Sequence, residues 1–289
     1  MVRGGLATCE LPGAVTDASA DAGAVGDPDA VLNAPPDGSV DAGTLDRDHD
    51  GIVDTLDDCP DVPDPAQADE DGDHLGDVCD PCPPFSNNTD TDGDGLGDAC
   101  DPNPTVPGDQ LVHFEGFAGA LSASWTTVGN FSTQGGNGVA KAPDGTSTIL
   151  AIASPAAARV EIRAALVLDT INSTGLNLGA IGLVDRLQPG TDKAVTCQLA
   201  ALTGATQPVL RIFDTATGTA VSSATHPVTL GSEIELRLRR DGTTYACHAT
   251  SPALEITGSD TFSPASPQIG LRLRNANGRA HWVMIVTSP

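Results

Sequence analysis

Basic residues are nearly absent from the first third of this 289-residue chain. Residues 1–109 hold 27 Asp and Glu against two bases, Arg3 and Arg47, so they carry the whole net charge of −25. Nucleic-acid binding needs clustered Lys and Arg to neutralise phosphates, and an anionic membrane surface repels such a segment. No apolar run approaches the ~20 residues of a transmembrane helix. The composition therefore argues against both kinds of partner and leaves a hard cation as the obvious one.

Aromatic residues are also scarce before residue 110. Phe85 is the only one of the chain's nine Phe, Trp and Tyr residues in that part. A segment with so few large apolar side chains and so much self-repulsion cannot bury an ordinary core. Residues 110–289, in contrast, hold 12 acids and 12 bases and are long enough for one sizeable domain. The chain therefore divides near residue 109.

The first 44 residues consist mostly of Asp, Ala, Gly, Pro and Val and show neither helical nor strand periodicity, which predicts a disordered tether. Within it, Leu6-Ala7-Thr8-Cys9 resembles the lipobox of bacterial lipoproteins. The resemblance implies lipidation of Cys9 and an outer cell-surface location. The residues before Cys9 do not supply the charged and apolar segments of a signal peptide. A start placed too far downstream and an ordinary free thiol therefore both stay open.

Six further cysteines can pair fully, which fits an oxidising, extracellular compartment. Cys79-Asp80-Pro81-Cys82 has the spacing of a redox motif, but a reactive thiolate needs positive surroundings, and these are acidic. Structural disulfides are therefore favoured. The cysteines expected to form them are Cys59, Cys79, Cys82, Cys100, Cys197 and Cys247.

Three 12-residue segments share one carboxylate spacing. They begin at Asp46, Asp69 and Asp90, and each has acids at positions 1, 3, 5, 9 and 12. Calcium takes ~6–8 oxygen ligands, and acids at positions 1, 3 and 5 converge when the chain curls around the ion. Gly at position 6 permits the sharp turn, and the carbonyl of position 7 then points inward. The predicted calcium ligands are Asp46, Asp48, Asp50, Ile52, Asp54, Asp57, Asp69, Asp71, Asp73, Leu75, Asp77, Asp80, Asp90, Asp92, Asp94, Leu96, Asp98 and Asp101.

The surroundings of these loops identify a family resemblance. Cysteines and prolines flank them in place of the helices of an EF-hand, as in Asp57-Asp58-Cys59-Pro60 and Gly97-Asp98-Ala99-Cys100-Asp101-Pro102. Residues 46–104 resemble thrombospondin type 3 repeats. The resemblance implies a nearly core-less chain that wraps around calcium ions and is linked by disulfides Cys59–Cys79 and Cys82–Cys100. A disordered acidic run is the alternative, but such runs do not repeat one register three times.

Binding of calcium is expected to drive folding of these repeats, because their carboxylates repel one another without it. The expected result is a stiff rod in calcium and a loose chain in chelator. His74 replaces Gly at position 6 of the second loop. We expect that site to be the weakest, since His adopts a left-handed backbone conformation at a cost.

From residue 110 onward, short alternating apolar runs recur between Gly, Pro, Asp and Asn. Residues 233–239 alternate strictly, and Asp241-Gly242 is a hairpin signal. About a dozen such runs predict a mainly β fold, an antiparallel sandwich, with the Ala-rich segment 155–166 ambiguous. The expected strands are 111–117, 123–128, 147–153, 159–168, 179–186, 194–202, 208–214, 232–240, 243–250, 267–274 and 279–287.

The order of features in this part resembles the concanavalin A-like/laminin-G-type jelly roll. Phe114-Glu115-Gly116-Phe117 opens it, Trp125 follows, and 281–286 forms the closing strand. Cys197 and Cys247 lie in alternating runs and are expected to form a disulfide between neighbouring strands. Two buried free thiols are the alternative.

No catalytic motif stands out. The Glu-x-Asp-x-x-Glu carrier of jelly-roll glycosidases, a Gly-x-Ser-x-Gly elbow and His-Glu-x-x-His are all missing. Glu233 and Glu235 next to arginines, and Glu161 with Arg163, indicate an outward charged face, so we expect no enzyme. Trp125 and Trp282 stand in apolar contexts that indicate core positions, not an exposed platform for sugars. These features favour binding over catalysis.

The predicted organisation is a tether (1–44), calcium-binding repeats (45–108) and a jelly-roll domain (109–289). The predicted function is a calcium-binding extracellular or cell-surface protein in adhesion or recognition, with Ca²⁺ as cofactor. The alternatives are a carbohydrate-binding module or jelly-roll glycoside hydrolase, and a purely structural spacer. The expected partners are calcium and a glycan or surface protein, with a membrane reached only through a lipid anchor.

Overall fold

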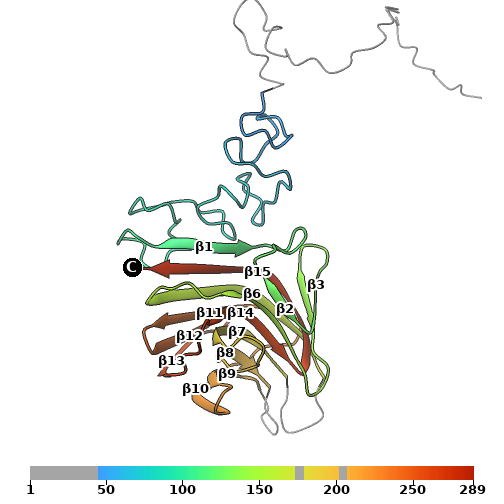
Figure 1. Cartoon of the computed structure of the whole chain (residues 1–289), viewed down its shortest axis with the longest axis vertical. Helices are drawn as coiled ribbons and strands as arrows, with labels where there is room; N and C mark the ends of the chain where they lie inside the picture. The colour runs from blue at the N-terminus through green and yellow to red at the C-terminus, as the bar shows by residue number, and fades with distance from the viewer. Residues whose placement is uncertain (1–44, 173–178, 202–206) are drawn as a thin grey trace, which may run out of the picture.

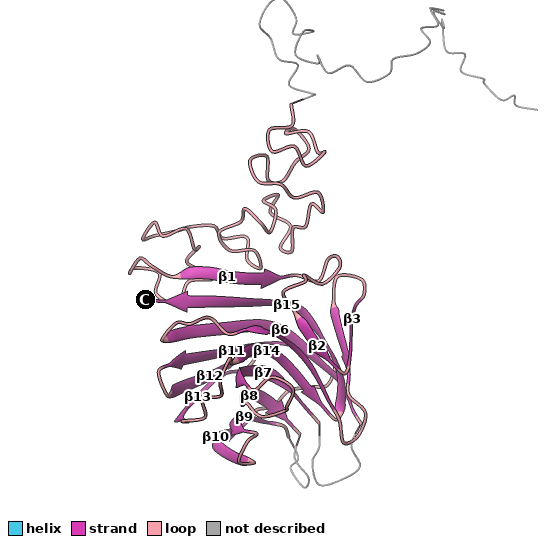
Figure 2. Cartoon of the chain, in the orientation of Figure 1, coloured by secondary structure: helices cyan, strands magenta, loops and turns pink. Residues whose placement is uncertain are grey.

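The computed structural model describes residues 45–172, 179–201 and 207–289 (Figure 1). These residues form strands, turns and loops without a helix (Figure 2). Accordingly, this part of the chain has no helix with the length and apolarity needed to cross a membrane. The predicted tether and Cys9 lie outside the described residues.

The strands all follow residue 109. They are β1 (Gln110–Glu115), β2 (Thr126–Val128), β3 (Asn130–Thr133), β4 (Gly138–Lys141), β5 (Ser147–Ala153), β6 (Arg159–Ile171), β7 (Ala180–Leu187), β8 (Val195–Ala200), β9 (Val209–Asp214), β10 (Thr219–Thr225), β11 (Glu233–Asp241), β12 (Thr244–Thr250), β13 (Ala253–Ser259), β14 (Gln268–Arg274) and β15 (Ala276–Ser288).

The strands form two antiparallel sheets. Sheet A has the order β13-β12-β11-β6-β15-β4-β3, with β1 also paired to β15, and sheet B has the order β10-β9-β8-β7-β14-β5-β2. The chain crosses from one sheet to the other at every connection from β1 to β3 and from β4 to β7, and again between β10 and β11, between β13 and β14, and between β14 and β15. The predicted antiparallel jelly-roll sandwich is therefore confirmed.

The core lies between the inner faces of the two sheets, which strand alternation supplies. On β11, Ile234, Leu236 and Leu238 point inward and are at most 1% exposed. Cys197 on β8 and Cys247 on β12 meet in this core as a disulfide. The pair is the predicted one, but the expectation that it joins neighbouring strands is wrong. It joins sheet B to sheet A, because both side chains point inward from facing layers.

Residues 45–109 form a chain of turns without strands. The predicted disulfides Cys59–Cys79 and Cys82–Cys100 are both present. A glycine is required beside each one, because a Cβ on Gly76 would lie 2.7 Å from the Sγ of Cys59, and a Cβ on Gly97 would lie 3.0 Å from the Cβ of Cys82.

The repeats are seated on the outer face of sheet A, next to β1 and β15 (Figure 1). Trp282, Met284 and Val286 on β15 form an apolar cluster there with Leu96 and the Cys82–Cys100 disulfide. The sandwich therefore has an apolar outer patch that the third repeat buries.

Candidate metal centres

Each aspartate loop curls at two residues whose backbone has the left-handed conformation (positive φ), at positions 4 and 6 of the loop. In the first loop they are His49 (φ 66°) and Gly51 (φ 99°), and in the second they are Gly72 (φ 78°) and His74 (φ 75°). In the third loop they are Gly93 and Gly95, with φ of 79° and 94°. Sequence analysis identified position 6 but missed position 4. The curl turns the backbone N–H groups of both positions toward the first carboxylate.

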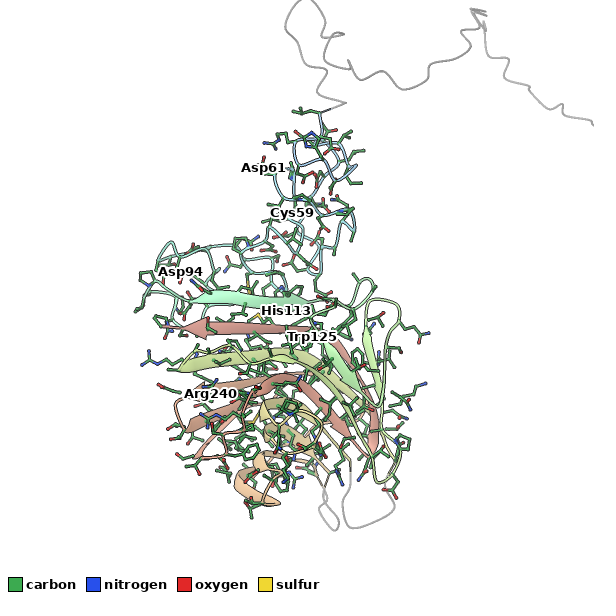
Figure 3. All side chains as sticks on the ribbon, viewed as in Figure 1. Cys59, Asp61, Asp94, His113, Trp125 and Arg240 are labelled. Carbon is green, nitrogen blue, oxygen red and sulfur yellow. A yellow bond between two sulfur atoms is a disulfide. The ribbon has the colours of Figure 1, made fainter. Side chains whose placement is uncertain are left out.

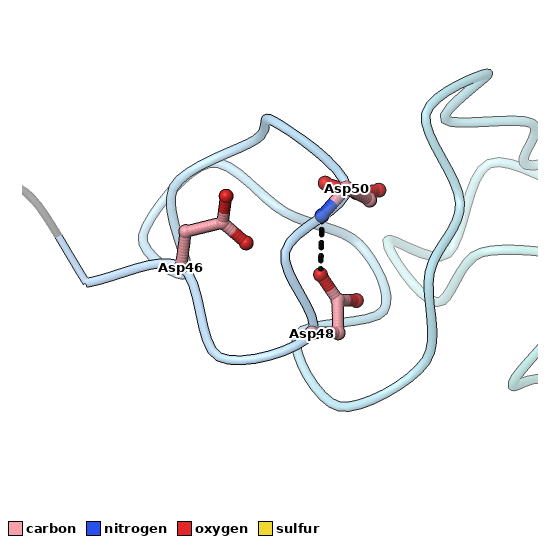
Figure 4. Close-up of side chains that lie close together, drawn as sticks. All are labelled: Asp46, Asp48 and Asp50. Carbon is pink, nitrogen blue, oxygen red and sulfur yellow. Dashed lines mark hydrogen bonds between the residues drawn. The ribbon is translucent and has the colours of Figure 1, made fainter. Parts of the chain in front are cut away.

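The first aspartate of each loop accepts those N–H groups. Asp46 accepts from the backbone nitrogens of His49 (2.8 Å) and Gly51 (3.2 Å). Asp90 does the same with Gly93 (2.7 Å) and Gly95 (2.9 Å). These bonds hold the carboxylates of positions 1, 3 and 5 together. In each loop one oxygen from each of the three lies within 4.8 Å of the others, and Figure 4 shows the first such group.

Nine buried side-chain oxygens in the repeats have no hydrogen-bond partner among the described residues, and they fall into three equivalent sets. Each set has one oxygen at position 3, one at position 12, and one that follows position 12 by seven or eight residues. A buried carboxylate oxygen without a partner is costly, so the repeated pattern is typical of oxygens that bind a cation. The sets are Asp48, Asp57 and Asp64; Asp71, Asp80 and Asn88; and Asp92, Asp101 and Asp109.

The last member of each set is bonded back to the aspartate at position 5. The backbone N–H of Asp64 donates to Asp50 at 2.8 Å, and that of Asp109 donates to Asp94 at 2.7 Å. In the second loop the Asn88 side-chain amide makes the same link to Asp73, at 2.7 Å. These three residues are candidate ligands that the sequence-based prediction did not include. The available signal was an Asp or Asn that follows position 12 by seven residues in the first repeat and by eight in the other two.

The third centre lies at the junction of the repeats with the sandwich. Oxygens of Asp94, Asp101 and Asp109 all lie within 4.8 Å of one another. Asp109 is 1% exposed and directly precedes β1. Asn103 donates from its side-chain amide to Asp109 at 2.9 Å and lies 3.4 Å from the hydroxyl of Ser288 on β15. One cation here would contact both parts of the molecule.

The electrostatics of the centres disfavour the charged carboxylates. Burial, followed by the nearby Asp109, raises the pKa of Asp101 to about 7. Burial also raises the pKa of Asp80 to about 6, with Asp71 and Asp73 contributing repulsion. A divalent cation bonded to these oxygens would offset both effects.

The predicted ligands at positions 7 and 9 differ in what they contact. No described N–H donates to the carbonyl oxygens of Ile52, Leu75 and Leu96, which leaves them free for a cation. The position-9 carboxylates instead accept the backbone N–H of position 2, as Asp54 does from Arg47 at 2.9 Å. Asp77 and Asp98 make the same bond at 2.9 and 2.8 Å. They close the loops, and none belongs to the carboxylate groups above.

The repeats cover the β6 part of the charged outer face of sheet A, where an open face was expected, whereas the Glu233 side chain on β11 is exposed as expected. Glu161 and Arg163 are only 3% and 4% exposed. Arg163 donates to Glu235 at 2.7 and 2.9 Å and to the carbonyl oxygen of Ala99 in the third repeat at 2.7 Å. Sequence alone could not show that a second segment lies over this face.

Both tryptophans are buried, as predicted. Trp125 is 6% exposed and packs in the sandwich core, and its ring lies edge-on to His113 at 4.9 Å (Figure 3). Trp282 is 7% exposed but lies under the repeats and outside the core between the sheets. Neither ring therefore offers an open platform to a sugar.

No family model matches the chain. No curated protein matches it either. A solved carbohydrate-binding module, CBM66 from Bacillus subtilis, is similar at 14% identity and a TM-score of 0.43, covering 54% of this chain and 91% of that chain. The exoplasmic/lumenal domain of VIP36, in a Ca²⁺/Man3GlcNAc-bound form, is similar at 13% identity and a TM-score of 0.43, covering 56% and 83%.

A xylan β-1,4-xylosidase from Bacillus halodurans C-125 is similar at 12% identity and a TM-score of 0.48. The match covers 62% of this chain and 40% of the xylosidase, so this chain spans less than half of that enzyme. At these identities and TM-scores the likenesses add nothing about function.

Proposed function

We propose that residues 45–109 bind Ca²⁺ at three centres and form a calcium-stabilised spacer that carries the sandwich of an extracellular protein. The observation that carries this proposal is the set of nine buried oxygens without partners, repeated in one register. Three disulfides fit an oxidising compartment, and the resemblance to thrombospondin type 3 repeats implies the same metal. Lipid anchoring through Cys9 belongs to the same proposal.

The donor chemistry favours calcium over other cations. Each centre offers carboxylate and backbone carbonyl oxygens, and the second adds the amide oxygen of Asn88; all of these suit hard cations. None of the described metal-binding groups contains His or Cys, the residues that zinc prefers. Magnesium demands near-octahedral geometry and keeps several waters, whereas calcium accepts ~6–8 oxygens in flexible arrangements. The density of protein oxygens in each loop fits calcium.

The physical role of the ions is to fold the repeats. The apolar cluster in the repeats is small and shared with β15. The free energy of calcium binding therefore becomes folding free energy. The third centre does more, because it includes Asp109, where the sandwich begins. Calcium there fixes the angle between spacer and sandwich, which suits a module held away from a surface for adhesion or recognition.

We infer that the sandwich acts by binding and not by catalysis. Glu161 is paired with Arg237 and Arg239, and Glu235 with Arg163. Carboxylates held in ion pairs beneath the repeats are poor candidates for the acid and nucleophile of a glycosidase. Incubation with a panel of plant and bacterial polysaccharides, followed by reducing-sugar assay, would overturn this inference if products formed.

Calcium titration of the whole chain by calorimetry tests the main proposal. Asp57→Asn, Asp80→Asn and Asp101→Asn each remove one anionic partnerless oxygen and should weaken the corresponding centre about tenfold or more. Asp61→Asn is the matched control, because Asp61 lies in the repeats with a side chain 74% exposed (Figure 3). A native chain that takes up no calcium, or equal losses in Asp61→Asn and Asp101→Asn, would contradict the proposal.

A further inference from the structure

A basic groove lies on the outer face of sheet B, over β7, β8, β9 and β14. Its open volume is about 720 Å³, a size that suits a small saccharide. In Figure 1, β7 and β14 lie in the middle of the sandwich, and β8 and β9 lie below them, farther from the repeats. The groove is therefore separate from the metal centres.

Strand pairing places the groove's polar side chains in one row across the sheet. Arg211 on β9 pairs with Gln198 on β8, Gln198 pairs with Gly182 on β7, and Gly182 pairs with Arg272 on β14. Gly182 has no side chain, and Ala180, two residues earlier on the same face, has a small one. A Cβ on Gly182 would lie 2.6 Å from the Cβ of Gln198, so Gln198 packs directly against this glycine, and Arg211 and Arg272 stand at the two ends of the row.

The charge of the groove is opposite to that of the whole protein. Four of its lining residues are basic, namely Lys193, Arg211, Arg272 and Arg274, and one is acidic, Asp192. Asp192 is already shared between Arg272 and Arg274. The net charge of the chain is −25, so this groove is a local concentration of positive charge. Its charge favours the binding of an anion in the groove.

Arg211 is the cation best placed to take that anion. Its guanidinium lies 4.1 Å from the ring centre of Phe213. With the Gln198 amide turned so that its oxygen faces Arg211, that oxygen accepts from Nε at 2.8 Å and from Nη2 at 2.9 Å. Burial and the neighbouring Arg272 lower its pKa to about 10, and no described carboxylate offsets them. A rigid, partly buried guanidinium without a counter-ion is costly until an anion arrives.

We propose that this groove binds the carboxylate of an acidic sugar in a polysaccharide or glycan, with Arg211 as the main contact. The planar guanidinium matches a planar carboxylate. The hydroxyl groups of Thr191 and Thr215 already donate to the backbone carbonyl oxygens of Gln188 and Asp192, so the sugar is held mainly through its carboxylate. The groove offers an acidic peptide no deep apolar pocket, since its one aromatic ring, Phe213, is covered by Arg211. This inference goes beyond the proposed calcium function and does not depend on it.

The test measures binding of the whole chain, in calcium, to immobilised oligosaccharides of glucuronate, galacturonate, mannuronate, guluronate and sialate. Each is presented beside its carboxyl-reduced counterpart. We expect at least one acidic sugar to bind and its reduced form to bind about tenfold more weakly or not at all. The proposal would be overturned if none of the five acidic oligosaccharides bound, or if a carboxyl-reduced form bound as tightly as its acidic counterpart. So would equal or tighter binding of a poly-aspartate peptide.

Variants locate the binding in the groove. Arg211→Gln should weaken it about tenfold or more, and Arg211→Lys should fall between, because Lys keeps the charge but loses the two-pronged geometry. Arg274→Gln, at the half-exposed rim, is a second variant in case Arg211→Gln does not fold. Lys141→Gln, on the edge region of sheet A, is the control and should stay within about twofold.

Binding that survives both groove variants would mean that calcium in the repeats bridges to the acid, and the groove proposal would fall. The Asp101→Asn variant tests the calcium proposal without changing the groove. It should lose calcium at the third centre while retaining the acidic sugar. Failure of the calcium proposal would therefore leave the groove result interpretable.

Discussion

The ring of Phe85 packs edge-on against the indole of Trp282, with ring centres 5.7 Å apart and planes at 77°. Phe85 belongs to the repeats and Trp282 to β15 of the sandwich. The guanidinium of Arg163 lies 5.0 Å from the Phe85 ring centre on another side. The only Phe, Trp or Tyr residue of the acidic part therefore packs at the contact with the folded domain, next to Leu96 and the Cys82–Cys100 disulfide.

Phe85→Ala should loosen the repeats from sheet A. Losing a half-buried ring and its aromatic contact should cost about 2–3 kcal/mol of stability at this interface. The emission of Trp282 should shift to the red, because the indole would meet water. Val106→Ala, at a site 59% exposed, is the control and should change neither quantity. Unchanged emission in Phe85→Ala would show that the packing is not maintained in solution.

His74→Gly should strengthen the second calcium centre. His74 has a φ of 75°, a conformation that Gly adopts without the penalty of a Cβ. Replacing it should raise the calcium affinity of that centre a few-fold, corresponding to about 0.5–1 kcal/mol. His49→Gly is the matched comparison, because His49 is strained in the same way in the first loop, at φ 66°. Calorimetry on both variants should show gains, and a loss in either would refute the strain argument.

Calcium affinity should fall as the pH decreases below about 7, most steeply at the third centre. Burial raises the pKa of Asp101 to about 7 and that of Asp80 to about 6. Protons therefore compete with calcium for these oxygens in that window. Titrations at about pH 7.5 and about pH 5.5 should show the weakening, together with a larger release of protons on calcium binding at the lower pH. A constant affinity across this range would count against these carboxylates as ligands.

The same raised pKa values predict how the stability of the calcium-free repeats depends on pH. The direction is opposite to that of the calcium affinity. A carboxyl whose folded pKa lies above its unfolded value near ~3.9 binds more protons in the folded state between the two values. The stability of the repeats without calcium should therefore decrease as pH rises through about 4 to 7. Small-angle scattering in chelator should show a more compact chain at the acidic end. Calcium at neutral pH should compact it as well, and identical dimensions with calcium and with chelator would exclude ion-coupled folding.

The two repeat disulfides should differ in their effect on the sandwich. Cys82–Cys100 is buried against Trp282 and Met284, whereas Cys59–Cys79 lies outside this cluster. Replacing both Cys82 and Cys100 by Ser should destabilise the third repeat by about 3 kcal/mol and lower the melting temperature of the sandwich. The matched Cys59 and Cys79 double variant should destabilise the repeats but leave the sandwich melting unchanged. Equal effects on the sandwich would show that the interface does not depend on the nearer disulfide.

Strand prediction found the central strands and the exposed edge strand β2, but it missed four strands at or next to the sheet edges. β11 has perfect alternation, and its burial follows the same period, so the pattern was sufficient. β3, β4, β10 and β13 were missed because they lie at or next to sheet edges and are partly solvent-exposed, so they need no apolar face. Hydrogen bonds to a neighbour hold these strands, and a neighbour cannot be read from local sequence.

Features that depend on neighbouring residues along the chain could be predicted from the amino-acid sequence. The acid spacing within 12 residues defines each loop, because a curled chain brings positions 1, 3 and 5 together wherever it occurs. Period-two alternation likewise determined the β-sandwich class, since it decides which side chains can be buried. The break in composition near residue 109 placed the boundary between the acidic part and the folded domain.

Contacts between residues far apart in the sequence became visible only in the folded structure. Asp109 completes the third centre because β1 begins there, and Trp282 is covered because the third repeat lies over β15. Cys197 forms a disulfide with Cys247 across the core. Arg211 and Arg272 lie at the two ends of a row of paired residues on four strands, with Gln198 and Gly182 between them. Each of these contacts joins residues through sheet pairing or layer packing, whose partners local periodicity does not specify.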